Sequence, residues 1–492
     1  MHILKQNRVH GTLKRSLAAV VLCYAASVTV RAVAEDAGTQ TSLPPAPTAQ
    51  LTLPAGVVVR RSVPAPLSLT LDQAVDLGLQ QNLQVELDNQ THRQLHGLTL
   101  TAFNALIPSL SASAQTSVQE INLAALGFSP ETIPANLLPD GFKLATIVKL
   151  QTTGAQINLN QQIFNLPAFE IYRASKETVR AQEFSALMTD GDVVQRVATQ
   201  YLQILADATT ISNKESLLKV DRELERQARE KHDAGVGTNL DLLRAQVQRQ
   251  NREQELITAR NTFAKDKIAL NRLMGEPADQ ELQLVDEVPY HELEMMSIEE
   301  AKQIAYQRRK DLLNLEAQQR SLALQRKAIT FERLPAVTLS GYYGVLGETH
   351  GLYHGIFNTQ AGLDFPIFQE ARIRGDAKVA DAQISHIRSQ VASLRNDIEQ
   401  QIRAAMLDVN SSAELVRVSR SNVDLATETV AETNDRYRAG VDDTLPVVRA
   451  LATLAGAQSQ FVNALFQFNQ AKLNLARNTG IVQTQYKKFL GN

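Results

Sequence analysis

The chain has 492 residues and a formal net charge of −2 at pH 7, and only 5% of its residues are aromatic, with no tryptophan. This composition favours long helices packed in thin layers over a globular catalytic domain. Basic residues are interspersed with acids and the net charge is close to zero, so nucleic acid is not an expected partner.

The N-terminus has the parts of a secretory signal. Basic residues precede an apolar stretch from Leu17 to Val30, and the small residues Ala32-Val33-Ala34 follow it. We therefore expect residues 1–34 to be a signal peptide cleaved after Ala34. The alternative is a membrane anchor, but the apolar stretch is shorter than the roughly 18 to 20 residues that a spanning helix needs.

The only cysteine, Cys23, lies inside that apolar stretch and lacks the preceding small residue of a lipoprotein signal. The mature chain would then contain no thiol, which excludes disulfides and cysteine metal sites. Residues 35–66 are rich in proline, threonine and alanine. This composition predicts an extended or disordered lead-in.

Each half of the chain then starts with a predicted helix. The first begins after Ser68 or Thr70, the candidate N-caps, and has apolar residues at helical spacing up to Pro108. Its counterpart begins at Ser297 and runs to Pro335. Both helices should end at the proline, because the residue before a proline disfavours helical geometry.

Four segments alternate between apolar and polar residues, which indicates strands. In the second half, Val337 to Val345 alternate, a Gly/His loop from Gly347 to Gly355 follows, and a second run ends at Pro366. In the first half, Leu110, Ala112 and Ala114 share one face, and alternation returns from Ala155 to Asn160. The loop between the first two strands, roughly 119–149, is the longer one.

Two very long helices are predicted after the strands, because no proline lies between Pro167 and Pro277. A helix from about Phe169 to Ala234 would be roughly 90 to 100 Å long at 1.5 Å per residue, which no compact domain needs. A turn at Gly235 reverses the chain, and a second helix returns to Gly275. The second half has the same order.

The two halves therefore form a tandem repeat of helix, strand, loop, strand and helix. Gly235 matches Gly440, and Arg244 matches Arg449. The last helix has an apolar stripe in steps of three and four, which is typical of coiled-coil packing, with Gln458 and Lys472 interrupting it. We divide the chain into a signal peptide 1–34, a lead-in 35–66, a first repeat 67–276, a linker 277–296, a second repeat 297–480 and a tail 481–492.

The strands have the length of tilted spans in a membrane barrel, about ten residues each. Four strands cannot close a barrel, so the chain must oligomerise, and three copies would give twelve strands. One face of the strands should then contact lipid and the other should line a wet lumen. The expected lipid-facing residues are Ile157, Leu159, Leu339 and Leu363, and the expected lumen-facing residues are Asn158, Gln360 and Asp364.

From Leu67 to Gly480, this ordered set of features resembles the TolC family of outer-membrane efflux proteins. The resemblance rests on the tandem repeat, the junctions at Pro108 and Pro335, the Phe365-Pro-Ile-Phe368 strand exit and the two glycine turns. It implies an α+β membrane protein: a homotrimer with a twelve-stranded β-barrel in the outer membrane of a Gram-negative bacterium, continued by a long α-helical barrel in the periplasm.

The resemblance also implies a function. The trimer would dock a periplasmic adaptor and, through it, an inner-membrane pump of the RND or ABC type. It would conduct substrates passively to the exterior as the exit duct of a tripartite efflux or type I secretion system, without a cofactor and without catalysis. Gly235 and Gly440 would make the adaptor-facing turns.

The tip departs from the family pattern. Relatives often carry an acid six positions after each turn glycine, but here Asp241 is matched by Pro446. We expect Arg244 and Arg449 to supply six cations per trimer, and the carboxylates Asp241, Asp442 and Asp443 to pair with them and hold a gate shut. The alternatives are that these are exposed tip charges, worth under about 1 kcal/mol each, and that the two later aspartates cap a helix.

Other interpretations are weaker. A coiled-coil structural or adhesion protein would also have long heptads, but it would lack paired two-faced strands. A long-helix lyase would need a polar catalytic cluster and no secretory signal. Gly235-Val-Gly237 lacks the third glycine and the preceding strand of a dinucleotide site. His92 with His96, and His350 with His354, could bind a metal weakly, but neither pair has a third ligand nearby.

Overall fold

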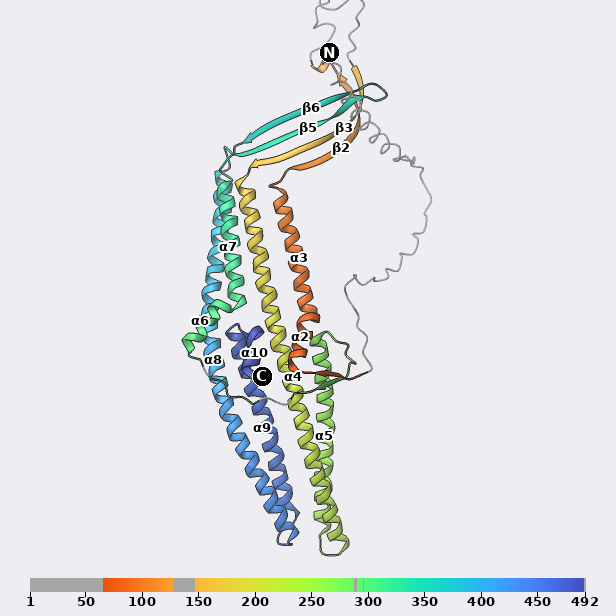
Figure 1. Ribbon diagram of the computed structural model, residues 1–492, viewed down its shortest axis with the longest axis vertical. Coiled ribbons are helices and arrows are strands. Elements are labelled where there is room, and N and C mark those ends of the chain that lie inside the picture. The colour runs from red at the N-terminus through yellow and green to blue at the C-terminus, as the bar shows by residue number, and fades with distance from the viewer. Residues whose placement is uncertain (1–64, 127–146, 287–289, 295, 491–492) are drawn as a thin grey trace, which may run out of the picture. The chain divides into compact units, whose positions relative to one another are not determined.

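The computed structural model describes residues 65–126, 147–286, 290–294 and 296–490. All of them belong to one compact unit, Arg60–Asn492. The expected signal peptide, almost all of the lead-in and most of the loop between the first two strands lie outside the described residues. Figure 1 labels the helices and the four longer strands of this unit.

The two long helical hairpins predicted from the sequence are present. Helix α4 (Leu166–Asp233) has 68 residues and returns as α5 (Asn239–Met274). Helix α8 (Glu370–Arg438) has 69 residues and returns as α9 (Thr444–Asn478). The start of α4 follows from its sequence, because the Asn165 side chain accepts a hydrogen bond from the Ala168 N–H and Pro167 lies in the first turn.

The helix that begins each half is broken in two, where the sequence predicted a single helix. The first half has α2 (Leu71–Gln81) and α3 (Leu83–Asn104), and the second has α6 (Ile298–Arg308) and α7 (Lys310–Phe331). Asn82 ends α2 and caps α3, and its side-chain amide donates to the Leu273 carbonyl at 2.8 Å. This local cap and the one tertiary bond explain the first break, which helical periodicity does not show.

Thr70 and Ser297 are the N-caps, and each forms a capping box with the residue three positions later. Ser68, the other candidate cap, lies instead in a short strand, β1 (Leu67–Leu69), which pairs in parallel with β4 (Leu282–Leu284). A 3₁₀ turn (Ala124–Leu126) and a last helix, α10 (Val482–Leu490), complete the elements.

Four strands form one antiparallel sheet in the order β2-β3-β5-β6. They are β2 (Ser109–Asn122), β3 (Ile147–Phe164), β5 (Ala336–Glu348) and β6 (Tyr353–Asp364). In Figure 1 the sheet follows the ends of α3, α4, α7 and α8 that lie away from the hairpin turns.

The expected loop from Gly347 to Gly355 is shorter than predicted. Gly347 pairs with Tyr353, and Val345 pairs with Gly355, so only residues 349–352 connect the strands. A Cβ on Gly347 would lie 2.4 Å from the Leu352 carbonyl oxygen. Glycine therefore allows a close strand approach here, which the sequence pattern had suggested was a loop.

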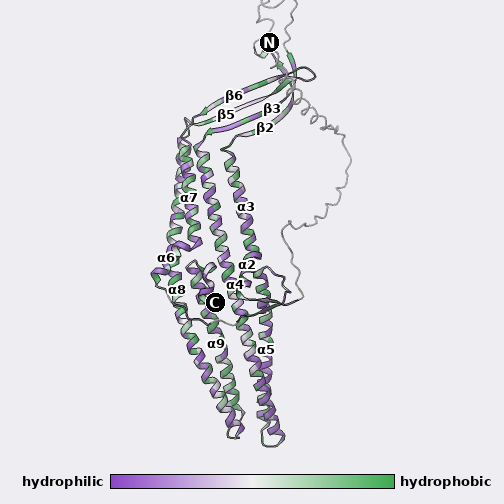
Figure 2. Cartoon of the chain, viewed as in Figure 1, coloured by the Kyte–Doolittle hydropathy of each residue, from purple (hydrophilic) through white to green (hydrophobic). Residues whose placement is uncertain are grey.

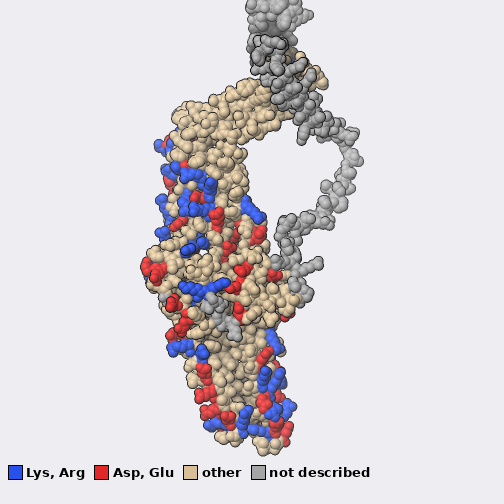
Figure 3. Space-filling view, viewed as in Figure 1, with Lys and Arg blue, Asp and Glu red and all other residues tan. Residues whose placement is uncertain are grey.

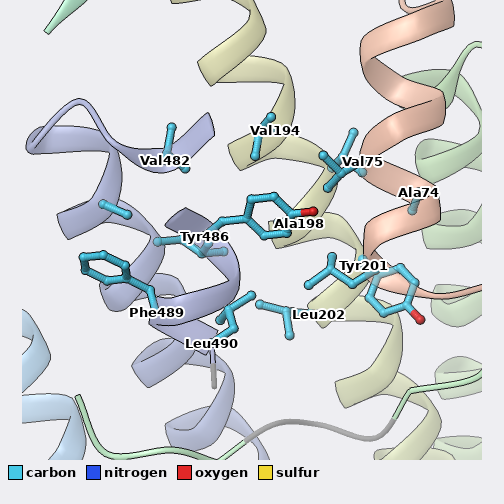
Figure 4. Packing of buried hydrophobic residues seen from close by; sticks show 14 of the residues in the cluster. Ala74, Val75, Val194, Ala198, Tyr201, Leu202, Val482, Tyr486, Phe489 and Leu490 are labelled. Carbon is cyan, nitrogen blue, oxygen red and sulfur yellow. The ribbon is translucent and has the colours of Figure 1, made fainter. Parts of the chain in front are cut away.

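The main apolar core lies where β1, β4, α2 and α10 pack against the middle of α4 and the end of α9. Figure 4 shows side chains of α2, α4 and α10 meeting there, among them Val75, Val194, Ala198, Tyr201 and Tyr486. The Tyr201 hydroxyl contacts the Leu69 carbonyl and an Asp286 carboxylate oxygen, both at 2.9 Å. This core joins the two halves of the chain at mid-length.

Lys472 lies in the apolar stripe of α9, but it does not face solvent, because its side chain is fully buried. Its ammonium group donates to the His291 carbonyl at 3.1 Å and lies 4.5 Å from the centre of the Phe468 ring. No helix of the described residues is apolar over a length that could cross a membrane, and in Figure 2 hydrophilic residues recur along the long helices.

Candidate functional site: the sheet faces and the hairpin tips

The strand register separates the apolar and polar residues of the sheet onto opposite faces. Ile157 pairs with Tyr343, Leu159 with Gly341, Leu339 with Ala361 and Leu363 with Val337, and these pairs all lie on one face. Asn158, Gln360 and Asp364 pair with Tyr342, Ser340 and Ala336 on the other. The two residue sets assigned from the sequence are therefore on different faces.

The apolar face carries more large side chains than the four residues expected to face lipid. Tyr343 and Phe357 face each other across β5 and β6, and they are 65% and 74% exposed in the single chain. A register shift between Gln162 and Phe164 also moves Phe164 opposite Val337 and so onto the apolar face. A strict two-residue alternation does not predict this bulge. The placement of Tyr343 and Phe357 on the apolar face, in contrast, follows from the alternation and could have been predicted from the sequence.

Amides and hydroxyls bond to one another across the polar face. The Gln156 side chain donates to the Asn158 amide oxygen at 2.9 Å, and the Asn158 amide donates to the Ser113 hydroxyl at 3.2 Å. The outer strands β2 and β6 each have only one partner, so each leaves an unpaired edge. The single chain thus presents a two-faced, open sheet.

Both hairpin turns close on a left-handed glycine. Gly235 and Gly440 have φ of 75° each. The N–H of Val236 bonds to the Lys231 carbonyl at 3.0 Å, and the N–H of Val441 bonds to the Arg436 carbonyl at 3.1 Å. This is the Schellman arrangement, in which the conformation of glycine allows the chain to satisfy the last helical carbonyls.

Four of the charged or polar residues just past these turns come together between the two hairpins. The Thr444 hydroxyl donates to Asp241 at 2.7 Å, and the Thr238 hydroxyl donates to the other oxygen of the same carboxylate at 2.5 Å. An Arg244 guanidinium nitrogen lies 3.7 Å from Asp241 and 3.7 Å from Asp443. We call Asp241, Arg244, Asp443 and Thr444 the tip cluster.

The tip cluster favours an ionised Asp241. Burial raises the pKa of this carboxyl, but the hydrogen bonds from Thr238 and Thr444 and the charge of Arg244 together hold the pKa below its ordinary value. A carboxylate that accepts hydrogen bonds from two hydroxyls and lies near a guanidinium is stabilised in its ionised form. The cluster thus joins the start of α5 to the start of α9.

Two of the residues expected at the gate lie elsewhere in the single chain. Asp442 pairs with Arg436, with the nitrogen and oxygen 2.6 Å apart. Arg449 forms no ion pair with any described residue, and Asp443 also caps α9 by accepting from the Leu445 N–H at 3.0 Å. Within one chain, therefore, only one of the two matched arginines bridges the hairpins.

A second bridge between the tips was not predicted. The Lys231 ammonium donates to the Tyr437 carbonyl at 3.0 Å and lies 3.6 Å from the centre of the Tyr437 ring, which is buried. Lys231 and Arg436 both lie four residues before a turn glycine. Their shared position could have drawn attention to them, but the sequence does not show that one reaches across and the other pairs locally.

The helices within each hairpin are held together by different interactions in the two repeats. Ion pairs cross between α4 and α5, including the buried pair Arg252–Asp221 at 3.2 Å and the pair Lys214–Glu255 at 2.9 Å. Between α8 and α9 the described residues form no ion pair, and Leu451 and Leu454 pack there with Ala426 and Tyr437. Figure 3 shows charged side chains along the first hairpin.

The two histidine pairs have different surroundings. His92 lies 3.5 Å from Glu183, and His350 lies in the loop before β6 while His354 lies within that strand. No group of three His, Cys, Asp or Glu side chains in the described part of the chain is placed to hold a metal ion.

Residues 79–276 and 302–481 match the family described as outer membrane efflux protein. Outer membrane protein TolC of Escherichia coli is 20% identical over 380 residues, which are 72% of this chain and 74% of TolC. The probable efflux pump outer membrane protein TtgC of Pseudomonas putida is 22% identical over 429 residues, 82% of this chain and 83% of that protein.

The fold is also similar to that of a solved structure. The Campylobacter jejuni CmeC outer membrane channel superposes with a TM-score of 0.71 and 16% sequence identity, covering 84% of this chain and 86% of CmeC. At this identity the likeness shows the fold, which combines a small sheet with long helical hairpins.

Proposed function

Since this chain belongs to the outer membrane efflux protein family, we propose that three copies assemble into one continuous duct, with a twelve-stranded barrel in the membrane and a helical barrel below it. The chain is an outer-membrane efflux channel of the TolC type. Its family acts by conduction, and we expect no catalytic activity from it.

The main support for the proposed trimer is the open sheet with one apolar and one polar face. Hydrocarbon offers no partner to an unpaired backbone group, so the free edges of β2 and β6 must be paired by further strands. Single-chain barrels start at about eight strands, and twelve strands leave room for an aqueous lumen. With Ile157, Leu159, Leu339 and Leu363 toward lipid, the face with Asn158, Gln360 and Asp364 would line that lumen.

We further propose that the hairpin tips dock a periplasmic adaptor, which links the duct to an inner-membrane pump. TtgC is named a probable efflux pump outer membrane protein. In Figure 1 the turns between α4 and α5 and between α8 and α9, which hold the two glycines Gly235 and Gly440, lie at the ends of these helices away from the sheet. The tip cluster would hold the two hairpins of a chain together in the closed state. An adaptor would open the tips by competing for the same groups.

Two measurements test the duct. The full chain, expressed in a Gram-negative host, should fractionate with the outer membrane and migrate on an unheated gel as a trimer that boiling dissociates. Purified trimer should then conduct ions in a planar bilayer. A coiled-coil adhesion protein or a soluble enzyme would give neither result. A trimer that never conducts, even with the tip cluster mutated, would contradict the duct.

A further inference from the structure

The polar face of the sheet carries almost no charge. Seven positions of β2 and eight of β3 lie on it, and none is ionisable: on β2 they are Ser109, Ser111, Ser113, Gln115, Ser117, Gln119 and Ile121, and on β3 they are Val148, Leu150, Thr152, Gly154, Gln156, Asn158, Asn160 and Gln162. Apart from the phenol of Tyr342, the ionisable residues of this face on β5 and β6 are Glu348, His354 and Asp364. In Figure 3 the visible part of the sheet shows almost no charged side chains, while the helices show many.

These few ionisable groups lie at the ends of the strands. Glu348 ends β5 and His354 lies near the start of β6, beside the loop, whereas Asp364 is the last residue of β6, where the chain leaves for α8. Ten residues separate His354 from Asp364, or roughly 33 Å of strand. Between these strand ends the polar face consists of amide and hydroxyl side chains, some of which bond to one another, and a few apolar side chains.

The carboxylate of Asp364 has no cation to balance it. It is exposed, forms no ion pair with any described residue, and its cross-strand neighbour is Ala336. The arginines nearest in sequence are already paired: Arg333 and Arg374 with Glu370, and Arg372 with Glu332. No lysine or arginine lies on this face of the described strands.

This inference rests on the proposed trimer, in which the polar face lines the lumen. Symmetry then places three Asp364 carboxylates at one height, at the helical end of the barrel. Rings of acidic side chains make a pore favour cations. We propose that Asp364 is the charge-selecting residue at the helical end of the membrane segment, while Glu348 lies at the loop end of the same face, so that the duct favours cationic and uncharged solutes over anions of the same size.

The reach of such a ring depends on salt. The Debye length is about 30 Å at 0.01 M ionic strength and about 3 Å at 1 M. Three carboxylates around a wide lumen should therefore bias permeation strongly at low salt and hardly at all at high salt. This salt dependence separates a charge effect from a change in pore width.

The test is the reversal potential of the purified full-length trimer in a planar bilayer under a KCl gradient. At low salt, Asp364→Asn should move the reversal potential toward the equilibrium potential of chloride. Asp364→Glu, which keeps the charge, should have the reversal potential of the wild type. Adding Gln360→Asp to Asp364→Asn should restore cation preference, because position 360 lies on the same face of the same strand. At about 1 M salt, where the Debye length is about 3 Å, all variants should coincide.

An Asp364→Asn channel that conducts with the wild-type reversal potential at low salt would overturn the assignment. Should this variant not assemble, Gln360→Lys in the natural chain gives a second test, and it should shift the reversal potential toward that of an anion-selective pore. No shift would contradict the placement of this face in the lumen and, with it, the role of Asp364. A wild-type chain that forms no channel at all would count against the duct itself and not against the role of Asp364.

Discussion

Asp241 and Thr444 start the returning helices of different repeats, and the Thr444 hydroxyl donates a hydrogen bond of 2.7 Å to the Asp241 carboxylate. Asp241 is the acid that the second repeat lacks at the matched position, where Pro446 stands. Beside Thr238 and Arg244 of its own hairpin, this acid thus has a partner from the other hairpin. One departure from internal symmetry thus creates a bond between the two halves.

The tip cluster predicts a change in conductance. Arg244→Glu would replace the cation between Asp241 and Asp443 with a third carboxylate, so the tips should separate and single-channel conductance should rise above wild type. Arg449→Glu is the matched control, because Arg449 forms no ion pair within the described chain. Equal increases in both variants would place the gate between neighbouring copies, and unchanged conductance in both would contradict a salt-bridged gate.

The sheet faces predict an asymmetry in tolerance to charge. Phe357→Arg should lower the yield of assembled trimer, because Phe357 lies on the apolar face in the middle part of β6, and arginine on the lipid face costs about 2 to 4 kcal/mol near the bilayer midplane. Gln360→Arg lies three residues away on the opposite face, and its trimer yield should stay close to wild type. Yields are compared on unheated gels of outer-membrane fractions, and equal losses would mean that the lipid-facing side is misassigned.

The glycine turns predict a loss of export without a loss of assembly. Gly440 has φ of 75° and a Cβ there would meet no other atom within 4 Å, so Gly440→Val would act through backbone strain of roughly 1 to 2 kcal/mol. We expect less export of a pump substrate from intact cells and a normal amount of trimer. Gly456→Ala, inside α9 and also uncrowded, should export normally. Loss of the trimer in Gly440→Val would assign the turn to folding.

The buried ammonium of Lys472 predicts a stabilising substitution. Burial lowers the pKa of Lys472 to about 8 from 10.5, so the charged form is disfavoured in the folded chain by about 2 to 4 kcal/mol. The penalty is full below pH 8 and disappears as the pH rises to 10.5. Lys472→Met, which also gives up the bond to His291, should raise the thermal unfolding midpoint at pH 7.

The pH dependence tests the cause. The difference between Lys472→Met and wild type should shrink or change sign as the pH rises to 10.5, because the wild-type lysine is then neutral in the folded chain and about half protonated in the unfolded chain. Lys378→Met replaces an exposed lysine on α8 and should leave the midpoint nearly unchanged at both pH values. A lower midpoint for Lys472→Met at pH 7 would show that the hydrogen bond to the linker outweighs the cost of the buried charge.

The sequence predicted the elements with strong local signals. Proline-free stretches and glycine turns located α4, α5, α8 and α9, and alternation located the four strands and separated their faces. The breaks at Asn82 and Arg309 were missed because their bonds reach distant residues, such as the bond of Asn82 to Leu273 and that of Arg309 to Gln401. Local sequence patterns do not indicate these distant partners.

The site was predicted only in part, because its contacts also join residues that are distant in the sequence. Internal alignment identified Arg244 and Arg449 as equivalent, but only Arg244 has an acid from the other hairpin beside it. The repeats also looked alike as helical hairpins, yet ion pairs join α4 to α5 whereas apolar packing joins α8 to α9. Equivalent positions in a duplicated chain share a backbone geometry, while their neighbours differ.

The two open edges of the sheet also have a genetic consequence. In a closed trimer each chain pairs its β2 with one neighbour and its β6 with the other, so a chain with a damaged edge strand spoils every assembly that it joins. When wild-type and defective copies are expressed equally and mix at random, only about one eighth of the trimers contain three intact chains. Alleles that disrupt β6 but still allow the chain to enter trimers should therefore be dominant-negative, whereas alleles that prevent secretion should be recessive.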